Sequence, residues 1–179
     1  IATRVRPKLR PGAGRPLHKP IPPKPLAYLA LTAQPYCVIL AKEMIFTSNE
    51  DRMIIKYTLE EAHSPTRLRL KPFLAFRNVH ELSHENIFAD KKYEKVPNGI
   101  KVRMYQGYTD LFMQLSVKNE YTHVPTWYYK IEYLKEMERG YDYQEDLYVP
   151  GFFEVEIQKG ESIYFQAGTR EINPVSLKR

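Results

Sequence analysis

The chain has 179 residues, of which 43% are hydrophobic and 27% are charged, a composition typical of a folded globular protein. No apolar run approaches the roughly 20 residues that a membrane helix needs, so we expect no membrane partner. The single cysteine, Cys37, excludes an internal disulfide framework and is typical of a reduced, cytoplasmic protein.

The net charge of +6 is carried by the start of the chain. Residues 1–26 contain seven basic residues, no acidic residue and seven of the fourteen prolines, whereas the other 153 residues hold 20 basic and 21 acidic side chains. We interpret residues 1–35 as a Pro-rich, basic arm or a segment outside the fold, because proline disfavours helix and central strand. The body lacks the basic surface of nucleic-acid-binding domains, so we expect no nucleic-acid partner; phosphate contacts by the arm are the alternative.

From residue 36 onward, the sequence shows the period-two alternation of strands with one buried and one solvated face. Strands are expected at 38–47, 53–59, 67–76, 100–104, 111–117, 153–158 and 163–167. Asn98-Gly99 is a hairpin signal, because both residues tolerate the positive φ of a type I′ turn. Seven or so strands predict an all-β fold, an antiparallel β-sandwich or barrel, over residues 36–179.

Two segments interrupt this pattern and predict short helical or loop insertions. Residues 78–90 fit a short helix or an ordered loop. Residues 131–139 have helical composition and end at Gly140, which suits a helix C-cap.

The first of these segments contains the motif H-E-x-x-H at His80, Glu81 and His84. On a helix, this spacing places two imidazoles one turn apart with the glutamate beside a zinc-bound water, as in zinc peptidases. However, Ile87 stands where one class of these enzymes needs a glycine to turn the chain. We therefore predict no metal site and keep a zinc-dependent peptidase as an alternative.

Residues 121–153 contain ten aromatic residues with many acidic residues between them. Aromatic rings can stack on the apolar faces of sugars while carboxylates and arginine bind the hydroxyls, whereas acids would repel phosphate. Asp142, Glu145 and Asp146 also suggest the paired carboxylates of glycosidases, although a solvated loop is the simpler interpretation.

Several runs resemble the N-terminal domain of bacterial and archaeal glycogen debranching enzymes. The resemblance covers about residues 36–170 and is carried by these runs: Lys71-Pro72-Phe73-Leu74-Ala75-Phe76-Arg77-Asn78-Val79-His80, Trp127-Tyr128-Tyr129, Glu138-Arg139-Gly140-Tyr141-Asp142-Tyr143 and Glu145-Asp146-Leu147-Tyr148-Val149-Pro150-Gly151. It implies a galactose-mutarotase-like super-sandwich and a part in glycogen metabolism, beside 4-α-glucanotransferase and amylo-α-1,6-glucosidase activities.

In that family, a C-terminal (α/α)6 barrel domain carries the hydrolytic carboxylates of the glycoside hydrolase. The resemblance therefore implies that residues 36–179 are the second half of an accessory N-terminal domain, without that barrel. We expect no catalytic residue and no cofactor in it. Its implied partners are the barrel domain and an α-glucan, either glycogen or a maltooligosaccharide. A purely structural module that packs on a partner domain is a further alternative.

We expect Arg77 and His80 to end a strand and to bind sugar hydroxyls or the partner domain. Trp127 is expected to offer a stacking surface, and Arg139 and Asp142 to form a pair that orders a loop. The expected substrate-binding residues are Arg77, His80, Trp127, Arg139, Asp142, Glu145 and Asp146.

Overall fold

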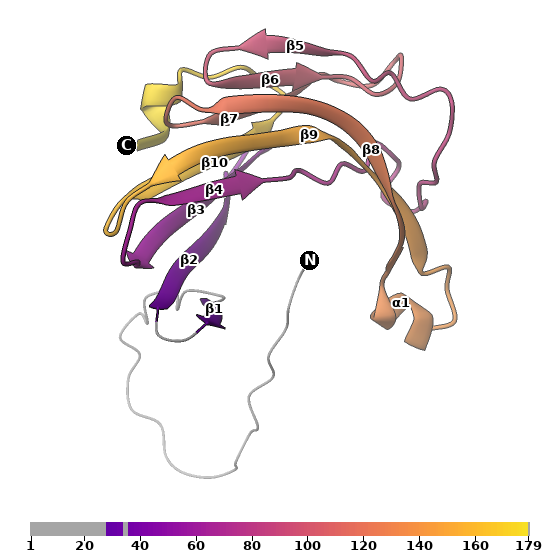
Figure 1. Ribbon diagram of the computed structural model, residues 1–179. Helices are drawn as coiled ribbons and strands as arrows, with labels where there is room; N and C mark the ends of the chain where they lie inside the picture. The colour runs from indigo at the N-terminus through magenta and orange to yellow at the C-terminus, as the bar shows by residue number, and fades with distance from the viewer. Residues whose placement is uncertain (1–27, 34–35, 179) are drawn as a thin grey trace, which may run out of the picture.

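The computed structural model describes residues 28–33 and 36–178, which form an antiparallel β-sandwich of two sheets (Figure 1). The large sheet has the order β1-β2-β3-β10-β7-β6-β5 and the small sheet the order β4-β9-β8. The large sheet consists of β1 (Tyr28–Ala33), β2 (Tyr36–Phe46), β3 (Arg52–Glu61), β5 (Tyr93–Val96), β6 (Gly99–Val102), β7 (Leu111–Leu115) and β10 (Ser162–Gly168). The small sheet consists of β4 (Thr66–Leu70), β8 (Glu120–Glu132) and β9 (Gln144–Ile157). The predicted all-β sandwich is confirmed.

The core lies between the two sheets and follows the period-two alternation of their strands. Phe153, Val155 and Ile157 of β9 point into it, while the intervening Glu154 and Glu156 lie on the other face. The ring of Phe153 packs against Phe165 of β10 with the ring centroids 5.8 Å apart, which joins the small sheet to the large one.

The hairpin between β5 and β6 forms at the expected place but with a different turn. Val96 pairs with Gly99, so the two turn residues are Pro97 and Asn98, and Asn98 takes the positive φ of 50°. Gly99 already belongs to β6. A Cβ atom there would lie 2.0 Å from the carbonyl oxygen of Met113, so the glycine allows close approach of two strands.

Of the two predicted insertions, the one at residues 131–139 contains a short helix and the one at residues 78–90 is a loop. Strand β8 runs on to Glu132, and α1 (Leu134–Glu138) is shorter than the expected helix over 131–139. Gly140 has a φ of 76° and its N–H donates to the carbonyl of Met137 at 3.0 Å, which confirms the C-terminal cap. Residues 78–90 form an ordered loop.

The ends of the described chain bear on the predicted boundary after residue 35. Strand β1 pairs with β2 through residues 28–33, so the large sheet begins before that boundary. Most of the predicted basic arm, residues 1–27, lies outside the described residues. At the other end, η1 (Pro174–Lys178) is a short 3-10 helix.

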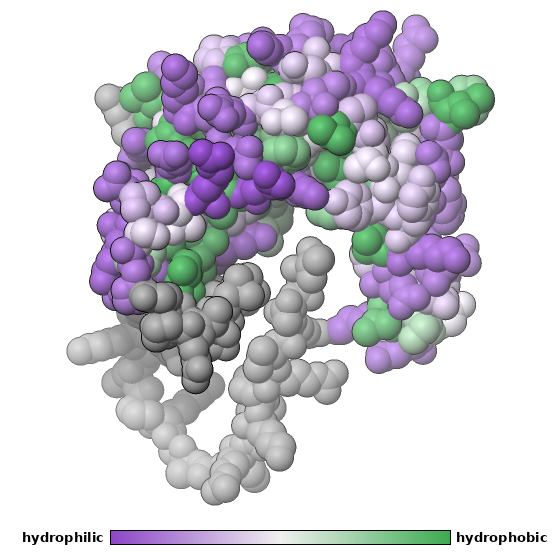
Figure 2. Space-filling model, in the orientation of Figure 1, coloured by the Kyte–Doolittle hydropathy of each residue, from purple (hydrophilic) through white to green (hydrophobic). Residues whose placement is uncertain are grey.

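Neither helix in the described part of the chain is long and apolar enough to cross a membrane. Figure 2 shows hydrophilic side chains over most of the visible face, with apolar ones in small groups.

Candidate functional site

The last residues of β8 and the first of β9 project beyond the core and carry α1 between them (Figure 1). The loop after β4 returns to this projection, because the N–H of Leu74 donates to the carbonyl of Tyr148 at 2.8 Å and the N–H of Asp146 to that of Ser83 at 2.8 Å. We call residues 77–85 and 129–146 together the loop end. It joins two parts of the chain that are some 60 residues apart in sequence.

Glu145, the second residue of β9, is the buried centre of the loop end. Its side chain is 0% exposed and accepts five hydrogen bonds from other described residues. Arg77 binds it with both Nε and Nη2, the latter 3.1 Å from Oε2. Ser83 donates its N–H at 3.1 Å and its hydroxyl at 3.0 Å, and the Tyr133 hydroxyl lies 2.5 Å from Oε2. One carboxylate thus fastens the loop after β4 to the segment before α1.

These bonds keep Glu145 ionised despite its burial. Burial alone raises the pKa of the Glu145 carboxyl, because it removes water from the charged form. The hydrogen bonds from Arg77, Tyr133 and Ser83 outweigh this effect of burial and lower the pKa of Glu145 to about 2. Since its side chain is fully buried and accepts five bonds from protein groups, Glu145 is a structural anchor of the loop end at neutral pH.

Asp146 holds a second pair of segments together. Its Oδ1 accepts the N–H of Lys130 at 2.9 Å and its Oδ2 accepts the N–H of Glu85 at 3.0 Å. Burial raises the pKa of the Asp146 carboxyl, but these two backbone bonds and the nearby His84 lower it overall. Lys130 has a positive φ of 54°, in the left-handed region, beside a register shift in the pairing of β8 with β9. The Asp146 bond holds the backbone at this unusual conformation.

The two segments held by Asp146 carry a pair of side chains that are not among the predicted site residues. The Tyr129 hydroxyl donates to Oε2 of Glu85 at 2.7 Å, and both side chains are exposed. Tyr129 belongs to the aromatic run, but nothing in the sequence distinguishes Glu85. Only the fold brings it to Tyr129, 44 residues away.

The structure brings three of the predicted site residues together and places His80 on the loop after β4, the same loop that carries Arg77. Arg77, Glu145 and Asp146 belong to one hydrogen-bonded cluster. His80 is exposed, and its N–H donates to Oδ1 of Asn78 at 3.0 Å.

The predicted roles of three other residues need correction. Trp127 is 6% exposed and packs against Tyr148 with the ring centroids 5.4 Å apart, so its ring offers no free stacking surface. Arg139 pairs with Glu136 at 3.1 Å and not with Asp142, because the turn of α1 places residues three apart on one face. Asp142 itself is exposed in the loop after α1.

The zinc-peptidase alternative required His80 and His84 on one face of a helix. They lie instead on the loop of residues 78–90, so the helical spacing is not present. Within the described ranges, no three His, Cys, Asp or Glu side chains are grouped so that they could hold a metal ion. His84 faces Asp146 with Nδ1 3.7 Å from Oδ2.

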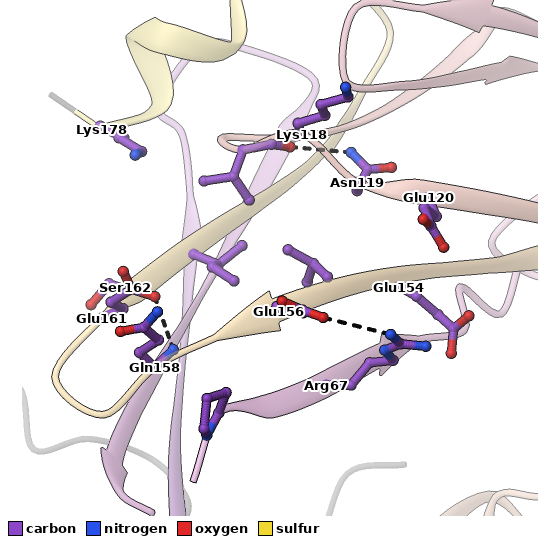
Figure 3. A pocket seen from close by; sticks show the side chains of 14 residues that line it. Arg67, Lys118, Asn119, Glu120, Glu154, Glu156, Gln158, Glu161, Ser162 and Lys178 are labelled. Atoms are coloured by element: carbon purple, nitrogen blue, oxygen red, sulfur yellow. Dashed lines mark hydrogen bonds and ion pairs between the residues drawn. The ribbon is translucent and has the colours of Figure 1, made fainter.

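A groove of about 720 Å³ opens away from the loop end, between β9, β10 and the turn that leads into β8 (Figure 3). It is lined by the apolar side chains of Val117, Val155 and Ile163 and by charged ones. These include Arg67 and Glu156, with Nη2 and Oε1 3.5 Å apart. The groove contains neither an aromatic ring nor a predicted site residue, so its chemistry does not match the expected sugar site.

Comparison with known proteins agrees with the resemblance seen in the sequence. Residues 34–164 match the model of a family described as "Glycogen debranching enzyme N terminal". The matched range contains the whole loop end. No curated protein and no solved structure matches the chain.

Proposed function

Because the chain belongs to the glycogen debranching enzyme N-terminal family, we propose that its sandwich binds α-glucan through the loop end, beside the catalytic domain of such an enzyme. In this role the domain holds a glucan chain for glycogen breakdown and does not itself break bonds. The proposal covers glycogen and maltooligosaccharides as ligands and an (α/α)6 barrel as the partner domain.

The observation that carries the proposal is the combination of exposed aromatic and polar side chains on a rigid frame. Tyr129 and Tyr141 are exposed at the loop end, and so are the polar side chains of His80, Arg139 and Asp142. Aromatic rings with a polar tip suit a ligand that has apolar faces and hydroxyl edges. The buried Glu145 and the partly buried Asp146 fix these segments, so little conformational freedom is lost on binding.

A second role, as a docking face for the partner domain, is favoured by α1. This helix has no buried residue, and its apolar side chains Leu134 and Met137 are 58% and 44% exposed. Exposed apolar groups at the end of a projecting hairpin are typical of surfaces that another protein covers. The two roles are compatible, since a docked catalytic domain would lie next to the same glucan.

Isothermal titration of the full chain with maltoheptaose tests the glucan role, with the β-linked cellohexaose as the matched control. We expect saturable heat with maltoheptaose and none with cellohexaose. Equal heats for the two sugars, or no heat with either, would contradict glucan recognition. If the chain then still formed a stable complex with a separately produced debranching-enzyme catalytic domain, the docking role alone would stand.

A further inference from the structure

We infer that Tyr129 and Glu85 form a subsite for one glucose unit of an α-glucan, with Asp146 as the residue that positions both. This inference rests on the proposed glucan binding and assigns it to a specific pair of side chains. The pair lies where the ordered loop of residues 78–90 meets the end of β8.

The two side chains present complementary chemistry to a sugar. Tyr129 is 57% exposed, so a pyranose can reach its side chain. Its hydroxyl donates to Oε2 of Glu85 at 2.7 Å, which fixes the ring relative to the carboxylate. Among the described residues, the Glu85 carboxylate forms no other hydrogen bond or ion pair, so its lone pairs can accept bonds from sugar hydroxyls.

The Asp146 carboxylate holds the backbone on both sides of the Tyr129–Glu85 pair. Asp146 accepts the N–H of Glu85 itself and the N–H of Lys130, the residue directly after Tyr129. Both backbone segments are therefore fixed whether or not the two side chains touch. A prearranged ring and carboxylate lose less conformational entropy when a ligand binds, which favours affinity.

Anchoring of the loop does not account for the bond between Tyr129 and Glu85. The loop is already fastened to β9 by the buried carboxylate of Glu145 and by the backbone bonds to Asp146. An exposed bond between two surface side chains adds little to stability, because water competes for both groups. Because the bond is exposed, it fits a surface that a ligand contacts better than a bond that stabilises the fold.

Maltoheptaose titration of four full-chain variants tests the subsite. We expect Tyr129→Ala to weaken binding roughly tenfold, because the ring is lost. Tyr129→Phe should weaken it less, since it keeps the ring and loses only the bond to Glu85. Glu85→Gln should weaken it by a similar, smaller factor, through loss of the charged acceptor. Phe46→Ala, which removes an exposed ring from the end of β2, is the matched control and should bind as the wild type does.

The outcomes separate the subsite from the wider proposal. If the wild type binds maltoheptaose and both Tyr129→Ala and Glu85→Gln bind equally well, the subsite is overturned and the proposed function stands. If the wild type gives no heat, both are overturned. Urea unfolding of each variant shows whether it is folded, and if Tyr129→Ala does not fold, Tyr129→Phe and Glu85→Gln decide the question.

Discussion

Arg77 and Glu145 lie 68 residues apart in the sequence and form a two-pronged ion pair at the loop end, with Nη2 of Arg77 3.1 Å from Oε2 of Glu145. The carboxylate is fully buried and the guanidinium is mostly so. An ion pair of this kind is costly to break, because removal of one partner leaves the other charge buried without compensation. This pair therefore determines whether the loop after β4 stays in place.

Arg77→Met should lower the free energy of unfolding by about 3–5 kcal/mol, since Glu145 would keep only the Ser83 and Tyr133 donors. Urea denaturation measures the loss. The matched control is Arg67→Met, which breaks the exposed pair with Glu156 and should cost less than about 1 kcal/mol. Similar losses in the two variants would contradict a buried anchor at Glu145.

The pH dependence of stability should show the Glu145 anchor directly. Its pKa is about 2 in the folded chain, below the ordinary value of 4.5, so the stabilisation is complete above pH 5 and disappears as the pH falls from about 4.5 towards 2. The shift corresponds to about 3 kcal/mol. Urea denaturation at a series of pH values should give a steeper acid decline for the wild type than for Glu145→Gln. Parallel declines would show that Glu145 titrates normally.

Trp127→Ala should affect stability and not glucan binding. The ring is buried against Tyr148, so its removal leaves a cavity and should cost about 3–5 kcal/mol. Maltoheptaose titration at low temperature, where the variant is still folded, should give the wild-type affinity. A variant with unchanged stability and lost affinity would show instead that Trp127 stacks on the sugar.

Asp146→Ala should weaken maltoheptaose binding by acting through Tyr129 and Glu85. Hydrogen exchange of the Glu85 and Lys130 amides should speed up, because both lose their acceptor. Asp90→Ala is the matched control, since it removes a similar bond to the Lys92 amide and should leave affinity unchanged.

A double-mutant cycle separates this positioning role from general destabilisation. If Asp146 acts only by holding the pair, Asp146→Ala should reduce affinity in the wild type and reduce it by a smaller factor in the Tyr129→Ala background, where only Glu85 is left to position. Additive losses of affinity in the double variant would contradict the positioning role.

The strands that the sequence reveals are those with an apolar inner face. Residues 153–157 alternate apolar and acidic side chains, and β9 follows that pattern. Strand β8 does not show it, because His123 and Pro125 occupy inward positions and two register shifts interrupt its pairing. Its residues resemble a loop until β9 is placed beside them.

The loop end is less predictable, because its bonds join residues that are distant in sequence. The run of acids between aromatics marks Glu145 and Asp146 as unusual, but the sequence cannot tell an anchor from a ligand-binding group. That distinction depends on burial and on donors such as Arg77 and Ser83, which only the fold brings within reach. Glu85 cannot be identified from the sequence for the same reason, because only the fold brings it to Tyr129.

The most direct test of glucan binding at the loop end is a nuclear magnetic resonance titration of the ¹⁵N-labelled chain with maltoheptaose. We expect saturable shifts that concentrate in the amides of residues 77–85 and 129–146, the largest near Glu85 and Tyr129. Shifts confined to the groove between β9 and β10, or no saturable shifts, would contradict it.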